Sequence, residues 1–173
     1  MRPVFLTGAR IYLRPLLAGD KEHAAAWFAS PFPINATRAE TFLKKEHQGG
    51  WPPGPQHLAI CRTDNDEVVG GATVRSWNWR IAWLAFHMAP WVAEADALRA
   101  EAVRIVVPWL RDERELMVVR LAIAADEAAT LAAAEELGMV RGVRLRERLA
   151  RPGGRVDQFF YEALNPRWEV PRA

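Results

Sequence analysis

Residues 101–139 read EAVRIVVPWLRDERELMVVRLAIAADEAATLAAAEELGM, and this stretch decides the fold. Apolar side chains in its first third recur at the spacing of one buried helical face: Val103, Val106, Val107 and Leu110. The β-prone run MVVRLAIA at 117–124 predicts a buried strand. An alanine-rich helix is expected over 126–137, because Gly138 suits the left-handed position that ends a helix. The stretch therefore predicts a helix, a strand and a second helix in succession.

Three strands are expected upstream of this stretch. HLAICR at 57–62 and VVGGATVR at 68–75 flank the turn TDND, so they predict a hairpin. RIAWLAFHM at 80–88 is the third strand. One helix separates it from the strand at 117–124, and such a unit is usually a right-handed parallel crossover.

The N-terminal part adds a strand and two helices to the expected fold. RIYLR at 10–14 alternates polar and apolar residues, as a half-buried strand should. A helical stretch is expected from Asp20 through Trp27. Thr37-Arg38-Ala39-Glu40 is a capping-box pattern, so it predicts a second helix that runs to about His47.

A last hairpin is expected to join 139–149 to 156–164 through RPGG. The elements together predict an α/β fold with a mixed sheet and helices on both faces. The chain has no internal repeat and no linker, so we expect a single domain over 1–173, with 165–173 as a flexible tail.

Composition excludes several classes of protein. The formal net charge is only +2, which predicts no strong nucleic-acid footprint. Cys61 is the only cysteine and the histidines show no metal-ligand spacing, so no metal site is expected. No apolar run approaches the length of a membrane span, and a cytoplasmic protein is expected.

Four stretches carry a family resemblance: LTGARIYLRPLLAGD at 6–20, WLAFHMAP at 83–90, the stretch at 101–139 and GGRVDQFFYEAL at 153–164. They resemble the GNAT (GCN5-related) N-acetyltransferases, in particular the branch that acetylates ribosomal-protein N-termini. The resemblance implies a mostly antiparallel mixed sheet. It also implies transfer of an acyl group from acetyl-CoA, or another acyl-CoA, to a primary amine of a peptide or small molecule. The strands at 80–88 and 117–124 would splay apart around the pantetheine arm.

The loop before the helix departs from that family. The family usually has Arg-Gly-x-Gly there, because backbone N–H groups at the helix N-terminus bind the pyrophosphate. In this chain the four positions hold Glu94, Ala95, Asp96 and Ala97. A carboxylate about 4 Å from a phosphate oxygen costs on the order of 4 kcal/mol at an effective dielectric constant near 20. The sequence thus predicts a degenerate phosphate loop.

Three interpretations of this loop stay open. Asp96 is a helix N-cap that satisfies the N–H groups a phosphate would take. Alternatively, CoA binds through strand contacts and Arg99 or Arg104, with a rearranged loop. As a third interpretation, the acids attract a cationic ligand. The resemblance assigns cofactor contacts to eight residues: Met88, Ala89, Ala95, Asp96, Ala97, Leu98, Arg99 and Glu127.

Thr130 and His87 are the candidate catalytic residues. Thr130 stands where the family has a serine that assists the leaving thiolate, although a helical threonine also bonds its own backbone. Glu127 stands at the position of a family asparagine, and a first-turn acid is also favoured by the helix dipole. His87 is the candidate base for the amine, or else a half-exposed structural histidine. The family's general-acid tyrosine has no counterpart on the helix at 126–137.

Four tryptophans gather near the third strand: Trp77, Trp79, Trp83 and Trp91. They suit a core, a homodimer contact or an aromatic pocket for the acceptor. The sequence is therefore compatible with two functions. The first is an acyl-CoA-dependent N-acyltransferase, and the second is a GNAT-fold protein that has lost acetyl-CoA use and binds a ligand or protein, or catalyses a different reaction.

Overall fold

The computed structural model describes residues 4–29, 34–48, 55–77 and 80–168. Eight strands form one sheet in the order β1-β2-β3-β4-β5-β6-β8-β7. Their bounds are β1 Leu6–Thr7, β2 Ile11–Pro15, β3 Gln56–Arg62, β4 Val68–Trp77, β5 Ile81–Met88, β6 Val118–Ala124, β7 Val140–Arg151 and β8 Gly154–Leu164. Neighbours are antiparallel except β5 and β6, which are parallel, so the predicted crossover is confirmed.

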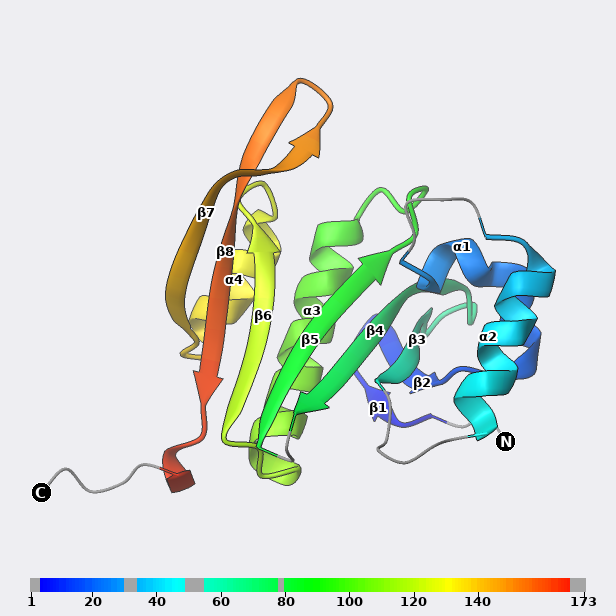
Figure 1. Ribbon diagram of the computed structural model, residues 1–173, viewed down its shortest axis with the longest axis horizontal. Coiled ribbons are helices and arrows are strands. Elements are labelled where there is room, and N and C mark those ends of the chain that lie inside the picture. Colours follow the sequence, from blue (N-terminus) through cyan, green and yellow to red (C-terminus); the bar gives the residue numbers. More distant parts are fainter. Residues whose placement is uncertain (1–3, 30–33, 49–54, 78–79, 169–173) are drawn as a thin grey trace, which may run out of the picture.

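Helices cover both faces of this sheet, as expected (Figure 1). Their bounds are a 3-10 turn Ala18–His23, α1 Ala24–Trp27, α2 Ala36–Gln48, α3 Ala95–Pro108, a π-helical turn Trp109–Glu113, α4 Ala128–Glu136 and a 3-10 turn Pro166–Trp168. α1 lies against β4 and β5 on one face, where the Trp27 carbonyl approaches Gly71. α3 and α4 pack against each other on the opposite face. Among the described residues, no helix combines the length and apolar character that crossing a membrane requires.

The core lies between the sheet and the pair α3 and α4. On α3 and its extension the predicted apolar face is buried: Val103, Val106, Val107 and Leu110. β6 contributes Val119, Leu121 and Ile123 from the face that meets α4, while Arg120 points to the other face. α3 continues past Pro108 into the π-helical turn, and Gly138 after α4 takes φ 69°, so the expected end of α4 is confirmed.

The two N-terminal helices differ in detail from the expectation. α2 begins at Ala36, and its cap is Asn35, whose Oδ1 accepts the Arg38 N–H at 2.8 Å, so the capping role expected of Thr37 is wrong. The stretch from Asp20 to Trp27 is not one helix, because a 3-10 turn runs to His23 and α1 begins at Ala24. The buried Asp20 carboxylate accepts two bonds from Arg14, at 2.7 and 2.8 Å, and this pair sets the path of the chain.

The end of the chain is partly docked. The buried Asn165 donates from Nδ2 to the Arg111 carbonyl at 2.6 Å, and the Trp168 indole donates to the Glu115 carbonyl at 3.0 Å. Residues 165–168 are thus held against the turn after α3, while 169–173, the rest of the expected tail, lie outside the described residues.

Candidate functional site

β5 and β6 separate at their C-terminal ends. The parallel register joins Ile81 to Val118 and continues only to Leu84 and Leu121. β5 runs on to Met88 while still paired with β4, and β6 runs on to Ala124 while still paired with β8. We call residues 85–88 of β5 and 122–124 of β6 the splayed strand ends (Figure 1). Backbone groups that face across the splayed strand ends have no strand partner there.

α3 begins directly beyond the splayed strand ends. A tight turn leads to it, in which Ala89 donates to the Val69 carbonyl at 2.8 Å and Val92 donates to the Ala89 carbonyl at 3.1 Å. Glu94 is the N-cap residue, and no side chain caps the helix. The N–H groups of the first turn and the positive end of the helix dipole therefore remain available to an anion.

Glu94 is held by an arginine that the sequence analysis did not single out. Its carboxylate forms an ion pair with Arg62 at the end of β3. The hydrogen bond from Arg62 lowers the pKa of Glu94. Glu67 lies 3.5 Å from the same guanidinium. The negative charge of Glu94 is thus partly neutralised and turned toward β3.

Asp96 caps a helix, but not its own. From the first turn of α3 its Oδ2 accepts the Ala129 N–H at 2.8 Å, and its Oδ1 accepts the Thr130 N–H at 3.1 Å. Both N–H groups belong to the first turn of α4. The expected cap on α3 is therefore wrong, because the side chain crosses to the neighbouring helix.

Thr130 is fully buried and faces Asp96. Its hydroxyl donates to Asp96 Oδ1 at 2.6 Å and lies 3.3 Å from the Asp96 carbonyl. The hydroxyl bonds the neighbouring helix rather than its own backbone. Its role toward a thiolate stays a prediction.

Arg99 and Glu127 also bind each other. Arg99 Nη1 lies 2.6 Å from Glu127 Oε1, and both side chains are mostly buried. Glu127 Oε2 accepts the Ala124 N–H at 3.1 Å, which closes the turn after β6. Arg151 at the end of β7 approaches the same carboxylate at 3.5 Å. Two residues assigned to the cofactor by resemblance thus link α3 to the N-terminus of α4.

His87 lies on the opposite face of β5 from α3. Its Nε2 is 3.3 Å from the Ala25 carbonyl, and the ring is half-buried. α1 sits closely on this part of the sheet, since a Cβ on the neighbouring Gly71 would lie 2.6 Å from the Trp27 carbonyl. When Nε2 carries the hydrogen and donates to Ala25, Nδ1 is left as an acceptor.

The remaining candidates are divided between core and surface. Met88, Ala89 and Leu98 are buried, so any contact with a cofactor would use their backbone. Trp83 is half-exposed on the face that carries Arg120, whose guanidinium lies 5.3 Å from its ring, and Trp91 is exposed. The Trp77 side chain and Trp79 lie outside the described residues. The expected core, dimer contact or acceptor pocket formed by the four tryptophans therefore stays a prediction. In the described part of the chain no His, Cys, Asp and Glu side chains gather as a metal site.

Comparison with known proteins decides the family. A protein classed as an acetyltransferase from Sphaerobacter thermophilus is 52% identical over 96% of this chain and 99% of its own, with a TM-score of 0.77. The chain belongs to the GNAT acetyltransferases. No family model and no curated protein matches it.

Two other GNAT structures share the fold with less identity. The ribosomal-protein-S5-alanine acetyltransferase of Vibrio fischeri is 12% identical over 96% of this chain and 100% of its own, with a TM-score of 0.66. Mycobacterium smegmatis RimJ, solved with CoA-disulfide, is 14% identical over 99% and 89%, with a TM-score of 0.65. In this GNAT protein the stretch at 101–139 forms the predicted helix, strand and second helix, and residues 94–97 contain no glycine.

Proposed function

We propose that this GNAT protein is an acyl-CoA-dependent N-acyltransferase, which transfers an acetyl group to the primary amine of a protein N-terminus or a small molecule. One observation carries the proposal: the splayed strand ends open directly beside the uncapped N-terminus of α3. Unpaired strand backbone suits an amide-containing arm, and an uncapped helix N-terminus suits a phosphate.

The residues present fit acetyl-CoA, although residues 94–97 contain no glycine. The backbone of 85–88 would hold the pantetheine amides, and the N–H groups of Ala95, Asp96 and Ala97 would face the pyrophosphate. Both loop acids are engaged elsewhere, Glu94 by Arg62 and Asp96 by α4. Their charges therefore oppose a phosphate less than free carboxylates would. When bound, the thioester supplies the activated acyl group.

His87 is the candidate base for this reaction. With Nε2–H donated to the Ala25 carbonyl, Nδ1 is the atom that takes a proton from the acceptor amine. Replacement of His87 by glutamine is expected to lower kcat about 100-fold and to leave the acetyl-CoA affinity unchanged. Release of free thiol measures the rate, and calorimetry measures the affinity.

The exposed His23 offers a matched control in the preceding 3-10 turn. H23Q removes an exposed imidazole that precedes α1 and should leave both values unchanged. If H87Q acetylates amines as fast as the unmodified protein, the role of His87 as the base is wrong.

A second candidate function is a GNAT-fold protein that no longer uses acetyl-CoA. The closed contacts among Asp96, Thr130, Arg99 and Glu127 favour it, because these side chains already satisfy one another. Such a protein would bind a ligand or partner, or catalyse another reaction. A purified protein that carries no CoA by mass spectrometry, and binds none, would support this candidate.

A further inference from the structure

The β7–β8 hairpin concentrates the positive charge of the molecule. Residues 140–155 contain six arginines, one glutamate and no other charged residue, a formal charge of +5. The whole chain carries only +2, so the rest of the molecule is net acidic. The small net charge of the chain therefore hides a strongly basic segment, whose local positive potential can attract an acidic partner.

The hairpin is an exposed edge of the sheet. In the described sheet β7 pairs only with β8, and none of its residues is buried. The register shifts between Leu145 and Leu149, where Glu147 takes φ 49° and donates its N–H to Asp157 at 2.8 Å. Beyond this bulge the hairpin projects past the rest of the sheet (Figure 1).

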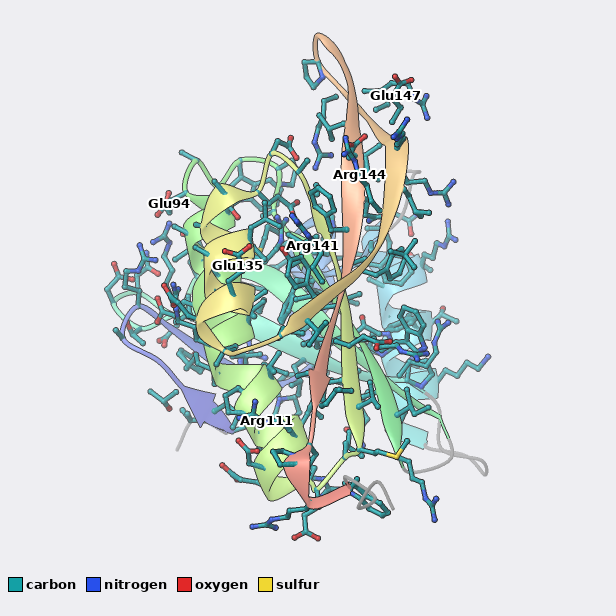
Figure 2. All side chains as sticks on the ribbon, turned by 90° about the vertical axis from the view of Figure 1, so that its left-hand side faces the viewer. Glu94, Arg111, Glu135, Arg141, Arg144 and Glu147 are labelled. Atoms are coloured by element: carbon teal, nitrogen blue, oxygen red, sulfur yellow. The ribbon has the colours of Figure 1, made fainter. Side chains whose placement is uncertain are left out.

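The projecting part contacts the turn between β6 and α4, beside the splayed strand ends, at two places. Arg151 binds Asp126 at 2.8 Å and lies 3.5 Å from Glu127, two residues between β6 and α4. Ala125 donates its N–H to the Asp157 carbonyl at 2.9 Å. The charged hairpin is therefore held against the end of β6, and Figure 2 shows Arg144 and Glu147 above the helix ends.

Two arginines of the hairpin are available to a partner. The guanidinium of Arg141 lies 5.1 Å from the Phe159 ring. Arg144 binds Asp157 at 2.6 Å, Arg151 binds Asp126, and Arg155 donates to the Glu147 carbonyl at 2.6 Å. Arg146 and Arg148 are exposed, and no ion pair among the described residues engages either of them. They flank Glu147 within the bulge, on the strand that forms the free edge of the described sheet.

We propose that the hairpin docks an acidic peptide segment of the acceptor protein, whose carboxylates pair with Arg146 and Arg148. The proposal rests on the proposed function and makes the acceptor a polypeptide with acidic residues after its amino terminus. An extended segment would lie along the free edge of β7, in the manner of strand addition. Arginine suits this role because its guanidinium binds a carboxylate with two parallel hydrogen bonds.

Two other occupants fit the hairpin less well. A second copy would bring two segments of charge +5 together, and like charges across strands are destabilising. Single-stranded nucleic acid usually stacks its bases on aromatic rings, but residues 140–155 contain no Phe, Tyr or Trp. An acidic peptide requires neither feature.

Fluorescence anisotropy tests docking apart from catalysis. The probes are two labelled peptides as long as β7 with blocked amino termini, one rich in Glu and Asp and the other with Gln and Asn in their place. At low salt the acidic peptide should bind about tenfold more tightly, and R146Q/R148Q should remove most of that preference. Thermal unfolding verifies that each variant is folded.

The matched control is R80Q/R114Q. It also removes two exposed positive charges, at residues whose only described side-chain contacts are with the rings of Trp168 and Trp109. It should keep the acidic preference. Equal binding of the two peptides, equal losses in the two double variants, or tighter binding of a single-stranded oligonucleotide of the same charge would each overturn the proposal.

Peptides with free amino termini and acetyl-CoA then separate this proposal from the proposed function. The acidic peptide should show a lower KM than its neutral counterpart, and R146Q/R148Q should raise that KM with kcat unchanged. Docking of the blocked peptide without any acetylation of the free one would refute the proposed function alone. Acetylation at equal kcat/KM for both peptides would refute the docking surface alone.

Discussion

α3 and α4 begin side by side, but their N-termini differ in side-chain capping. No side chain caps α3, whereas α4 receives a complete carboxylate cap from Asp96 in the first turn of α3. Asp96, which was expected to oppose phosphate binding at the N-terminus of α3, therefore caps the N-terminus of α4. The comparison teaches that an acid near a helix N-terminus opposes a bound anion only if its charge points toward that anion.

Asp96→Ala should have the largest effect on stability. It removes the cap from α4 and leaves the buried Thr130 hydroxyl without its best acceptor. A loss of about 2 kcal/mol in the free energy of unfolding is expected. Urea denaturation measures it. E94A should leave the midpoint nearly unchanged, and an equally large loss in E94A would contradict the assigned difference between the two acids.

Thr130→Val tests the other half of this contact. It deletes the hydroxyl that donates to Asp96 at 2.6 Å, and should destabilise the protein by about 1 kcal/mol. T130S keeps a hydroxyl and should retain most of the stability. A T130V protein that is as stable as the unmodified one, but that transfers no acetyl group, would instead show that the hydroxyl serves the reaction.

Glu94→Gln measures what the loop acid does to the α3 end. Removal of its charge should tighten acetyl-CoA binding about threefold, a modest gain because Arg62 already partly neutralises the carboxylate. The gain should fade at high salt, which screens exposed charges. Calorimetry at two salt concentrations checks this, and a gain of several hundredfold would mean that the charge points at the phosphate.

Arg151→Gln should have the smallest effect and a defined pH dependence. The hydrogen bond from Arg151 lowers the pKa of Asp126 below its usual value. A lowered carboxyl pKa contributes stability above the usual value, which is lost as the pH falls through the lowered one. R151Q should cost about 0.5 kcal/mol at neutral pH, since the pair is half-exposed, and should match the unmodified protein in strong acid. A difference that persists in acid would assign the effect to packing.

Local patterns in the sequence predict the elements but not the contacts between them. The apolar spacing from Val103 to Leu110 and the glycine at 138 act within a few residues, so the α3 face and the end of α4 were predictable. The β-α-β order similarly predicted the parallel pair that splays.

Local sequence patterns could not predict which groups the charged side chains of the site would contact. Asp96 meets Thr130 across 34 residues of chain, and Glu94 meets Arg62 across 32. Both contacts depend on how α3 packs against α4 and β3, and helix propensity favours a cap on the nearest helix end. Six arginines within 140–155 were visible in the sequence, but only the bulge and the Arg151 anchor show where they project.

The central claim is that the N-terminus of α3 still accepts a phosphate. The most direct test is calorimetric titration of the unmodified protein with acetyl-CoA and, separately, with S-acetylpantetheine, which has the same thioester and arm but no phosphates. We predict micromolar binding of acetyl-CoA and far weaker binding of S-acetylpantetheine. Equal affinities, or no binding of acetyl-CoA, would contradict the claim and favour a GNAT fold that has turned to another ligand.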